Sequence, residues 1–335
     1  MSSPTPTEMP TEPDINDVRA AAERIKDYAV RTPLLESPHL NDVVGGRLLI
    51  KAEPLQRTGS FKFRGAFNTI SQLPADKKAS GVVTYSSGNH AQGVAAAAQL
   101  LGIPAVIVMP EDAPALKIEN TRGYGAEVVL YDRYSESREE IGAAISAERG
   151  LSLIKPYDDP AIIAGQGSVG LEIAEQMTDA GIGAPDQVLA PCGGGGLISG
   201  TAIAIKDAFP DAQVFAVEPE DFDDTARSLK QGTRQEIDPD ARTICDALMP
   251  PTPGELTFGI NLRLLAGGLV VSDGQVREAM RQAFLRLKLV VEPGGVVALA
   301  AALSGAVDCR NRTSVVICSG GNVDPSFFAE VLAAA

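Results

Sequence analysis

One lysine lies in a stretch whose neighbours can prepare it for chemistry. The stretch reads TGSFKFRGA from Thr58 to Ala66. Its glycine permits a tight turn, Ser60 can cap a helix, and the apolar spacing over 61–73 predicts that helix. Lys62 then falls in the first helical turn, where free N–H groups and the positive dipole end disfavour an ammonium. Most lysines are simply solvated, but an amine with a lowered pKa here would be ready to form a Schiff base.

A second stretch places small polar residues after a strand. The expected strand 82–85 runs into SSGNHAQG, from Ser86 to Gly93, and a helix follows. The carboxyl end of a strand and the next helix N-terminus form the usual ligand site of an open α/β sheet. Backbone N–H groups and hydroxyls there can hold a carboxylate, and Asn89 can bond a ring hydroxyl. A plain capped turn is the alternative, and His90, one of two histidines, has only a supporting role.

Two more stretches repeat the strand–loop pattern. Gly193–Gly196 follow a strand and open a helix. Such glycines let the backbone close around a phosphate and direct its N–H groups at it, helped by the helix dipole. The loop is neither a Walker loop nor a dinucleotide fingerprint, and a flexible hinge is the alternative. Further on, VVICSGGN runs from Val315 to Asn322, and Ser319 sits where the strand ends, so its hydroxyl can face a ring nitrogen or merely form a turn.

A lysine, a phosphate cradle and partners for a ring hydroxyl and a ring nitrogen together describe pyridoxal 5'-phosphate. The sequence resembles the fold-type II pyridoxal-phosphate enzymes, specifically the serine/threonine dehydratase (threonine ammonia-lyase) and serine racemase family. The motifs SFKFRGA, SSGNHAQG, GGGG and SGGN occur in the family's order, from about Ile15 to the chain end. The resemblance implies an α/β fold of two open, mostly parallel sheets with helices on both faces, as in the tryptophan synthase β-like enzymes.

The resemblance also implies cofactor contacts. It makes Lys62 the Schiff-base lysine and Phe61 a neighbour that packs on the ring. Asn89 matches the residue bonded to the cofactor's 3-hydroxyl. Gly193–Gly196 match the phosphate loop, and Ser319 matches the partner of the pyridine nitrogen.

Substrate contacts follow in the same way. Ser86, Asn89 and His90 lie where the family holds the substrate carboxylate. Arg138 matches a substrate-facing arginine of the serine racemases. Ser87 matches the serine that acts as acid and base on the face opposite the lysine.

The implied reaction is β-elimination of a hydroxy amino acid such as L-threonine or L-serine to a 2-oxo acid and ammonia, with Lys62 as general base. Alternatives within the class are 3-hydroxyaspartate dehydration and serine racemisation. The segment 249–254 replaces a more serine-rich loop of the racemases, which leaves the substrate side chain open. A non-catalytic cofactor-binding regulator is the alternative from another class, and the intact lysine argues against it.

An acidic turn predicts a metal site. The strand 214–217 ends in EPEDFDD, beginning at Glu218. Five acids in seven residues are costly to gather unless water or a cation screens them. A solvated acidic turn before a helix is the alternative. The resemblance to the serine racemases implies a site for Mg²⁺, Mn²⁺ or Ca²⁺ formed by Glu218, the carbonyl of Phe222 and Asp224.

The elements that carry these motifs alternate between strand and helix, which predicts parallel sheets covered on both faces. We expect a disordered tail at 1–14, a large cofactor-binding domain formed by 15–79 and 157–335, and a small inserted domain at 80–156. The proline-rich segment 238–266 reads as irregular. The expected helices are 15–30, 61–73, 91–101, 115–124, 137–149, 162–177, 197–209, 276–289, 296–307 and 325–332.

The amino-acid composition limits the kinds of molecule that the protein can bind. The chain has 335 residues and a net charge of −14, which argues against a nucleic-acid partner. No apolar run predicts a membrane span. Four cysteines without C-x-x-C spacing read as reduced thiols of a cytoplasmic protein. We expect a small amino-acid substrate and a homodimer.

Overall fold

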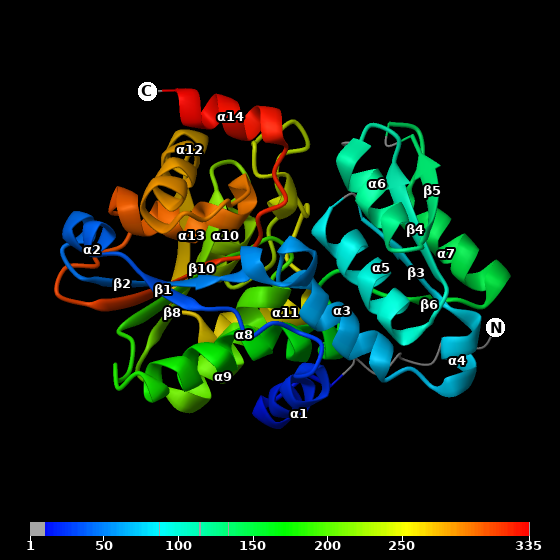
Figure 1. Cartoon of the computed structure of the whole chain (residues 1–335), viewed down its shortest axis with the longest axis horizontal. Coiled ribbons are helices and arrows are strands. Elements are labelled where there is room, and N and C mark those ends of the chain that lie inside the picture. Colours follow the sequence, from blue (N-terminus) through cyan, green and yellow to red (C-terminus); the bar gives the residue numbers. More distant parts are fainter. Residues whose placement is uncertain (1–10, 87, 114, 133, 335) are drawn as a thin grey trace.

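Two sheets form the two lobes of the molecule, as Figure 1 shows. The structure is a computed structural model that describes residues 11–86, 88–113, 115–132 and 134–334. The larger sheet has the strand order β1-β2-β10-β7-β8-β9 and the smaller one β5-β4-β3-β6. Within these residues, β1 and β2 pair antiparallel and the other neighbours pair parallel. The predicted fold is confirmed.

The strands are β1 (Leu34–Glu36), β2 (Arg47–Ala52), β3 (Val82–Tyr85), β4 (Ala105–Pro110), β5 (Glu127–Tyr131), β6 (Ser152–Leu153), β7 (Gln187–Pro191), β8 (Gln213–Pro219), β9 (Gly267–Val271) and β10 (Thr313–Cys318). The α-helices are α1 (Ile15–Ile25), α2 (Pro38–Val44), α3 (Lys62–Ser71), α4 (Ala75–Ser80), α5 (Asn89–Leu101), α6 (Ala115–Gly123), α7 (Arg138–Arg149), α8 (Pro160–Asp179), α9 (Gly196–Ala208), α10 (Asp224–Gln231), α11 (Glu255–Leu264), α12 (Asp273–Gln282), α13 (Pro293–Ser304) and α14 (Pro325–Ala333). No helix within the described residues is both long and apolar enough to cross a membrane.

Side chains of the large sheet alternate between two hydrophobic cores, as the period of a strand requires. Val316 packs with α13 on one face, whereas Val315 and Ile317 pack with α8 and α9 on the other. Both faces are therefore covered, which explains why the parallel strands read as continuous apolar runs.

Helix α3 belongs to the core of the small sheet as well as to the large lobe. Phe63, Phe67 and Ile70 of α3 pack in one cluster with Val82 and with the alanine-rich helix α5. The same helix contacts α8 of the large lobe. The lysine helix therefore lies where the two lobes meet, which Figure 1 shows between α5 and α8. The exact domain limits stay a prediction.

The expectation of an irregular segment at 238–266 is wrong in its last part, because α11 forms at Glu255–Leu264. The side chain of Asp158 accepts hydrogen bonds from the backbone N–H groups of Glu255, Leu256 and Thr257. A cap supplied from nearly a hundred residues upstream satisfies the free N–H groups of the helix, and local sequence does not reveal it.

Candidate active site

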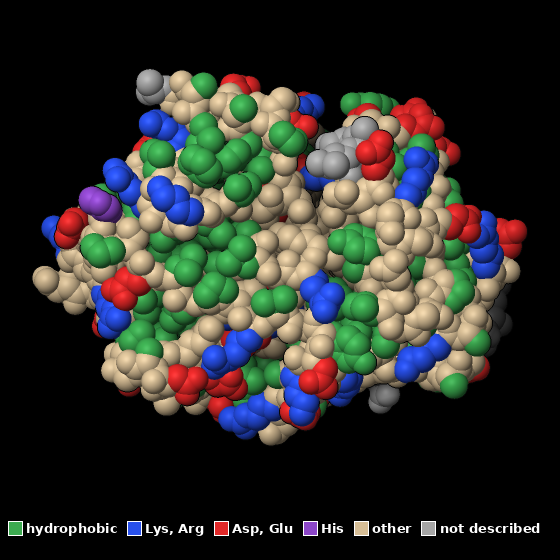
Figure 2. All heavy atoms as spheres, viewed as in Figure 1, with side chains coloured by type: hydrophobic (Ala, Val, Ile, Leu, Met, Phe, Trp, Pro, Cys, Tyr) green, Lys and Arg blue, Asp and Glu red, His purple; other side chains and the backbone are tan. Residues whose placement is uncertain are grey.

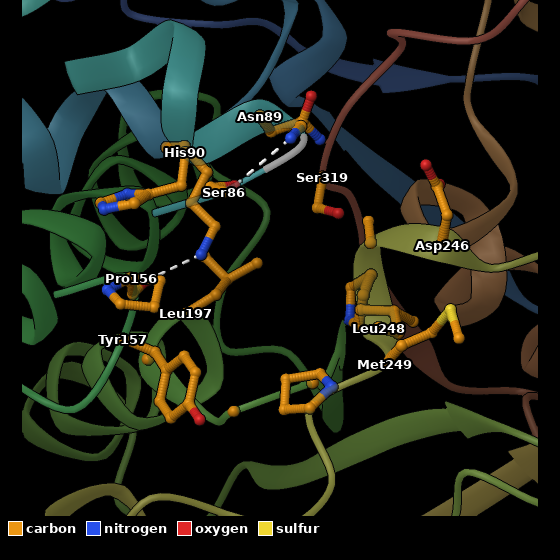
Figure 3. A pocket seen from close by; sticks show the side chains of 18 of the residues that line it. Ser86, Asn89, His90, Pro156, Tyr157, Leu197, Asp246, Leu248, Met249 and Ser319 are labelled. Atoms are coloured by element: carbon orange, nitrogen blue, oxygen red, sulfur yellow. Dashed lines mark hydrogen bonds between the residues drawn. The ribbon is translucent and has the colours of Figure 1, made fainter. Parts of the chain in front are cut away.

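The four predicted motifs meet in one pocket between the lobes. Figure 3 shows Ser86, Asn89 and His90 on one side, Asp246, Leu248 and Met249 on the other, and Ser319 between them. Ser86 and Ser319 follow the carboxyl ends of strands, and Asn89 and His90 begin a helix, which is the edge where open α/β sheets bind ligands, whereas Asp246, Leu248 and Met249 come from a short 3-10 turn and its end. The predicted residues that line the pocket are Phe61, Lys62, Ser86, Asn89, His90, Arg138, Gly193, Gly194, Gly195, Gly196 and Ser319. Ser87, the predicted acid and base, lies outside the described residues.

Lys62 begins α3 and its amine points into the pocket region. Its Nζ donates to the carbonyl of Pro156 at 2.8 Å, the contact that ends at Pro156 in Figure 3, and lies 5.3 Å from the ring centre of Phe61. Burial lowers the pKa of the Lys62 ammonium from 10.5 to about 8. The shift has the direction expected for a reactive amine, with burial as its cause in place of the expected helix dipole.

The expected cap by Ser60 is wrong. Phe61 occupies the N-cap position without a side-chain cap, and Ser60 is extended and bridges to Gly320. In addition, the N–H of Phe61 donates to the carbonyl of Ser319 at 3.1 Å. These backbone contacts place the end of β10 beside Lys62, so the bridge replaces the cap.

Asn89 is held by a buried polar cluster. Its Nδ2 donates to Oε1 of Glu292, and its Oδ1 accepts from Asn322 at 2.7 Å. Burial, with Asp246 nearby, raises the pKa of Glu292 from 4.5 to about 7. The second oxygen of Glu292 is buried without a hydrogen-bond partner. Glu292 therefore brings a carboxyl group that readily holds a proton to the edge of the pocket.

The glycine loop leaves no room for side chains. A Cβ on Gly194 would lie 2.3–2.4 Å from the ring of Tyr157, and one on Gly195 would lie 2.8 Å from Thr257. Gly195 also has a φ of 95°, in the left-handed region that favours glycine. Gly196 then begins α9, so free N–H groups and the dipole of a 13-residue helix face the pocket. This arrangement suits a phosphate.

His90 and Arg138 differ in what they offer a substrate. Nε2 of His90 lies 3.2 Å from the carbonyl of Ile154, which can only accept, so this nitrogen carries the proton. Burial, and secondarily Lys62, lowers the pKa of His90 to about 3. A neutral imidazole gives a carboxylate no positive charge. Arg138, by contrast, is a guanidinium 5.7 Å from the ring centre of Tyr85, and it lines the pocket.

The acidic turn lies beside the pocket, not in it. Glu218 is fully buried, and its two oxygens accept from the N–H groups of Thr225 and Ala226 at 2.9 and 2.8 Å. Asp224 is 2% exposed, and its Oδ2 has no hydrogen-bond partner. Burial raises the pKa of both carboxyl groups, to about 7 for Asp224, and the nearby Asp224 adds to the shift of Glu218. Phe222 is also buried.

An ion pair joins the lobes at the pocket. Nζ of Lys117, on α6, lies 2.6 Å from Oδ2 of Asp246, in a short turn of the large lobe. The Lys117 side chain is 13% exposed and that of Asp246 is 54% exposed. Both residues line the pocket and also a second cavity beside it, next to Asn120 and Phe327.

Sequence reasoning missed several residues of the pocket: Tyr85, Lys117, Tyr157, Asp246 and Glu292. Glu292 had a signal, because it is the single charge in an apolar run from Leu289 to Leu303. The other four residues have no distinctive sequence motif around them, and only the folded chain brings them to the pocket.

Comparisons with known proteins agree with this geometry. The family model described as "Pyridoxal-phosphate dependent enzyme" matches residues 25–320. An L-threo-3-hydroxyaspartate ammonia-lyase of Saccharomyces cerevisiae is 43% identical over 96% of this chain and 96% of its own length. A serine racemase of Schizosaccharomyces pombe is 41% identical over 96% and 97%. The solved structure of a threonine deaminase from T.th. has a TM-score of 0.87 and 46% identity, over 93% of this chain and 99% of its own.

Proposed function

Because the chain belongs to the family of pyridoxal-phosphate dependent enzymes, we propose that it eliminates water from a hydroxy amino acid such as L-serine or L-threonine, giving a 2-oxo acid and ammonia. The observation that carries the proposal is the meeting of Lys62, Asn89, Gly193–Gly196 and Ser319 in one pocket. Of the three relatives described above, one is an ammonia-lyase, one a deaminase and one a serine racemase.

The residues present fit pyridoxal phosphate. The glycine loop would offer its N–H groups to the phosphate, and a Cβ on Gly194 or Gly195 would clash with the packed wall. Lys62 supplies the amine that would hold the aldehyde carbon, Asn89 would bond the ring hydroxyl, and Ser319 would be the partner of the ring nitrogen. When bound, the cofactor supplies a sink for the electron pair left on Cα.

Lys62 then acts on the substrate as general base. Its amine has a pKa of about 8, so near neutral pH it exchanges protons readily, and it takes the Cα proton from its own side of the pocket. Ser319 contributes through what it lacks. Beside the ring nitrogen of a bound cofactor, the Ser319 hydroxyl would not keep that nitrogen protonated as a carboxylate would, and this would favour prompt β-elimination.

A substrate panel tests the proposal. Purified enzyme is incubated with L- and D-serine, L- and D-threonine and the 3-hydroxyaspartates, and ammonia, 2-oxo acid and inverted enantiomer are scored separately. We expect equal amounts of ammonia and 2-oxo acid from at least one L-substrate. Cofactor binding without turnover of any compound would favour a non-catalytic regulator instead.

Hydroxyaspartate is the second candidate substrate, because Arg138 lines the pocket with a positive charge that a second carboxylate can pair with. The yeast relative carries that substrate in its name. Arg138→Gln should raise KM for 3-hydroxyaspartate by tenfold or more, from loss of roughly 1.5–3 kcal/mol, while KM for serine changes little. An equal loss for both substrates would contradict this role.

Racemisation is expected to depend on Ser87, the predicted acid and base for the face opposite Lys62. Ser87→Ala should reduce inversion of serine more than dehydration of L-serine, because Lys62 acts unaided from its own face. The two rates are measured on the same preparation. Equal loss of both would contradict the division of labour.

A divalent cation at Glu218, the carbonyl of Phe222 and Asp224 is part of the proposal. Two buried carboxyl groups with raised pKa values and one unpartnered oxygen fit a hard cation, which would relieve their mutual repulsion. Within the described residues, no three His, Cys, Asp or Glu side chains are placed so that they could hold a metal ion together, so a carbonyl and water would complete the ligand shell. EDTA should lower Tm and activity together, and Mg²⁺, Mn²⁺ or Ca²⁺ should restore both. If Tm and turnover do not change after full chelation, the acidic turn binds no cation and serves only as a capped turn.

We also infer a homodimer. Figure 2 shows hydrophobic side chains gathered on one face of the large lobe. The exposed large apolar residues of this lobe include Phe284, Leu285 and Val290. Exposed apolar residues of this kind often mark an interface between subunits. Light scattering should give twice the 35.0 kDa chain mass, and a fully active monomer would refute the inference.

A further inference from the structure

The phosphate loop follows β7 and the acidic turn follows β8, and these two strands are neighbours in the large sheet. Pro191 of β7 lies opposite Val217 of β8 in register. One residue further, the N–H of Cys192 donates to the carbonyl of Val217 at 2.9 Å. Cys192 directly precedes the glycine loop, and Glu218 directly follows Val217. The sheet therefore holds the start of the phosphate loop and the first carboxylate of the acidic turn next to each other.

A second link runs through side chains. The Thr225 hydroxyl lies 3.4 Å from Sγ of Cys192, and that sulfur lies 3.4 Å from the carbonyl of Gly193. The N–H of the same threonine donates to Glu218. Both Thr225 and Cys192 are buried, so water does not compete for these contacts. Thr225 thus donates its backbone N–H to the Glu218 carboxylate, and its hydroxyl lies next to both that carboxylate and the Cys192 sulfur, which leads on to the phosphate loop.

The acidic turn is incomplete without a ligand. Asp224 is almost fully buried, and its Oδ2 has no hydrogen-bond partner. Asp224 also begins α10, so whatever fixes its carboxylate fixes the first turn of that helix, including Thr225. The position of the threonine hydroxyl against Cys192 depends on the same turn.

We propose that Thr225 and Cys192 couple a divalent cation at Glu218 and Asp224 to the phosphate loop, so that cation and cofactor each tighten the binding of the other. The inference rests on the proposed cofactor and cation. A bound cation fixes the start of α10, which fixes Thr225 against Cys192 and orders the first N–H groups of the loop. Because coupling of binding free energies is reciprocal, the phosphate raises the affinity for the cation by the same factor.

The test measures release of pyridoxal phosphate from the holoenzyme, followed by loss of its near-visible absorbance on dilution, in Mg²⁺ and in EDTA. We expect Mg²⁺ to slow release by about fivefold or more, the lower range of typical coupling. Thr225→Val keeps the shape and the backbone N–H to Glu218 but removes the hydroxyl. In this variant Mg²⁺ should still raise Tm yet no longer slow release.

Thr257 provides a matched control, because it is a buried threonine whose hydroxyl donates to the carbonyl of Gly194 at 2.7 Å, in the same loop but away from the acidic turn. Thr257→Val should speed release while keeping the full Mg²⁺ effect. If Thr225→Val does not fold, Cys192→Ala removes the same contact from the other side. A Mg²⁺ effect on release that survives in Thr225→Val, or in Cys192→Ala, overturns the coupling. Near-visible absorbance without any Mg²⁺ effect on the parent protein also overturns it, yet leaves the proposed reaction standing.

Discussion

At Lys62 the fold places an amine where its positive charge is poorly supported. It begins α3, burial lowers its pKa to about 8, and its hydrogen bond goes to a neutral carbonyl. The neighbouring Arg64, two residues on, has two carboxylate partners instead. The contrast separates a cation that stabilises the fold from an amine that is left available for reaction.

Lys62 is therefore predicted to carry the cofactor. Borohydride reduction of the purified protein followed by peptide mapping should label Lys62, and Lys62→Ala should lose the near-visible absorbance and at least a thousandfold in turnover, as expected when the attachment point and the base on its face are removed together. Lys155→Ala provides a control near the pocket wall. Label on any lysine other than Lys62 would refute the mechanism.

Glu292 is predicted to make stability depend on pH. Its folded pKa of about 7 lies above the ordinary 4.5, so between these values the folded protein holds a proton that the unfolded chain releases. This contribution is present in full below about pH 4.5 and is lost as pH rises through 7, at up to about 1.4 kcal/mol per unit. Urea unfolding at pH 5, 6, 7 and 8 should show the wild type losing stability relative to Glu292→Gln. A difference that stays constant with pH would contradict the shift.

Short motifs made much of the site predictable from sequence. Lys62, Asn89, Gly193–Gly196 and Ser319 each follow a strand or begin a helix, where side-chain chemistry concentrates in a few consecutive residues. Tyr157 shows why the rest was not predictable. It reaches the pocket because its ring packs on Gly194, and nothing in its own neighbourhood in the sequence records that contact.

At the scale of elements, a buried ion network fixes the lysine helix. The Arg64 guanidinium pairs with Glu53 at 2.8 Å and with Glu172 at 2.6 Å, and Lys51 pairs with Glu172 at 2.6 Å. These residues lie on α3, β2 with the turn after it, and α8. Arg64 and Glu53 are fully buried, so the network positions the first turn of α3 against the large lobe without help from solvent.

Removal of one partner from this ion network should lower the free energy of unfolding. Arg64→Met is predicted to destabilise the protein by about 3–5 kcal/mol, because it leaves buried carboxylates without their cation. Arg19→Met is the control, since Arg19 is paired with Asp207 at the surface and should cost about 0.5 kcal/mol or less. Chemical denaturation of both variants measures the difference, and similar values for the two would show that the network adds nothing beyond a surface pair.

Elements with strong periodic patterns were predictable, and those fixed by distant contacts were not. Strand β3 at Val82–Tyr85 matches the expected strand 82–85, and the expected helix 197–209 corresponds to α9 at Gly196–Ala208. Strand β9 was not predicted; it begins with two glycines, which have a low strand propensity, and it pairs parallel with β8. Helix α11 depends on its cap from Asp158.

At the scale of the molecule, the site exists only where the two lobes meet. Lys62 and Asn89 come from helices packed on the small sheet, whereas the glycine loop and Ser319 come from the large one. The alternation of strands and helices predicted both sheets. It did not predict that α3 shares its core with the small sheet, because sequence order places α3 before the first strand of that sheet.

The Lys117–Asp246 ion pair makes the contact between the two lobes sensitive to salt concentration. It crosses from one lobe to the other, and its Asp246 side is about half exposed, so dissolved ions screen it. We expect KM for the amino-acid substrate to rise between 20 mM and 500 mM KCl as the pocket opens more readily, and Lys117→Met to reduce that dependence. Steady-state kinetics of both proteins across the salt series measure it, and parallel curves would exclude the pair as its cause. The salt concentration around the protein would then change how long a substrate stays enclosed, and one ion pair would make turnover depend on ionic strength.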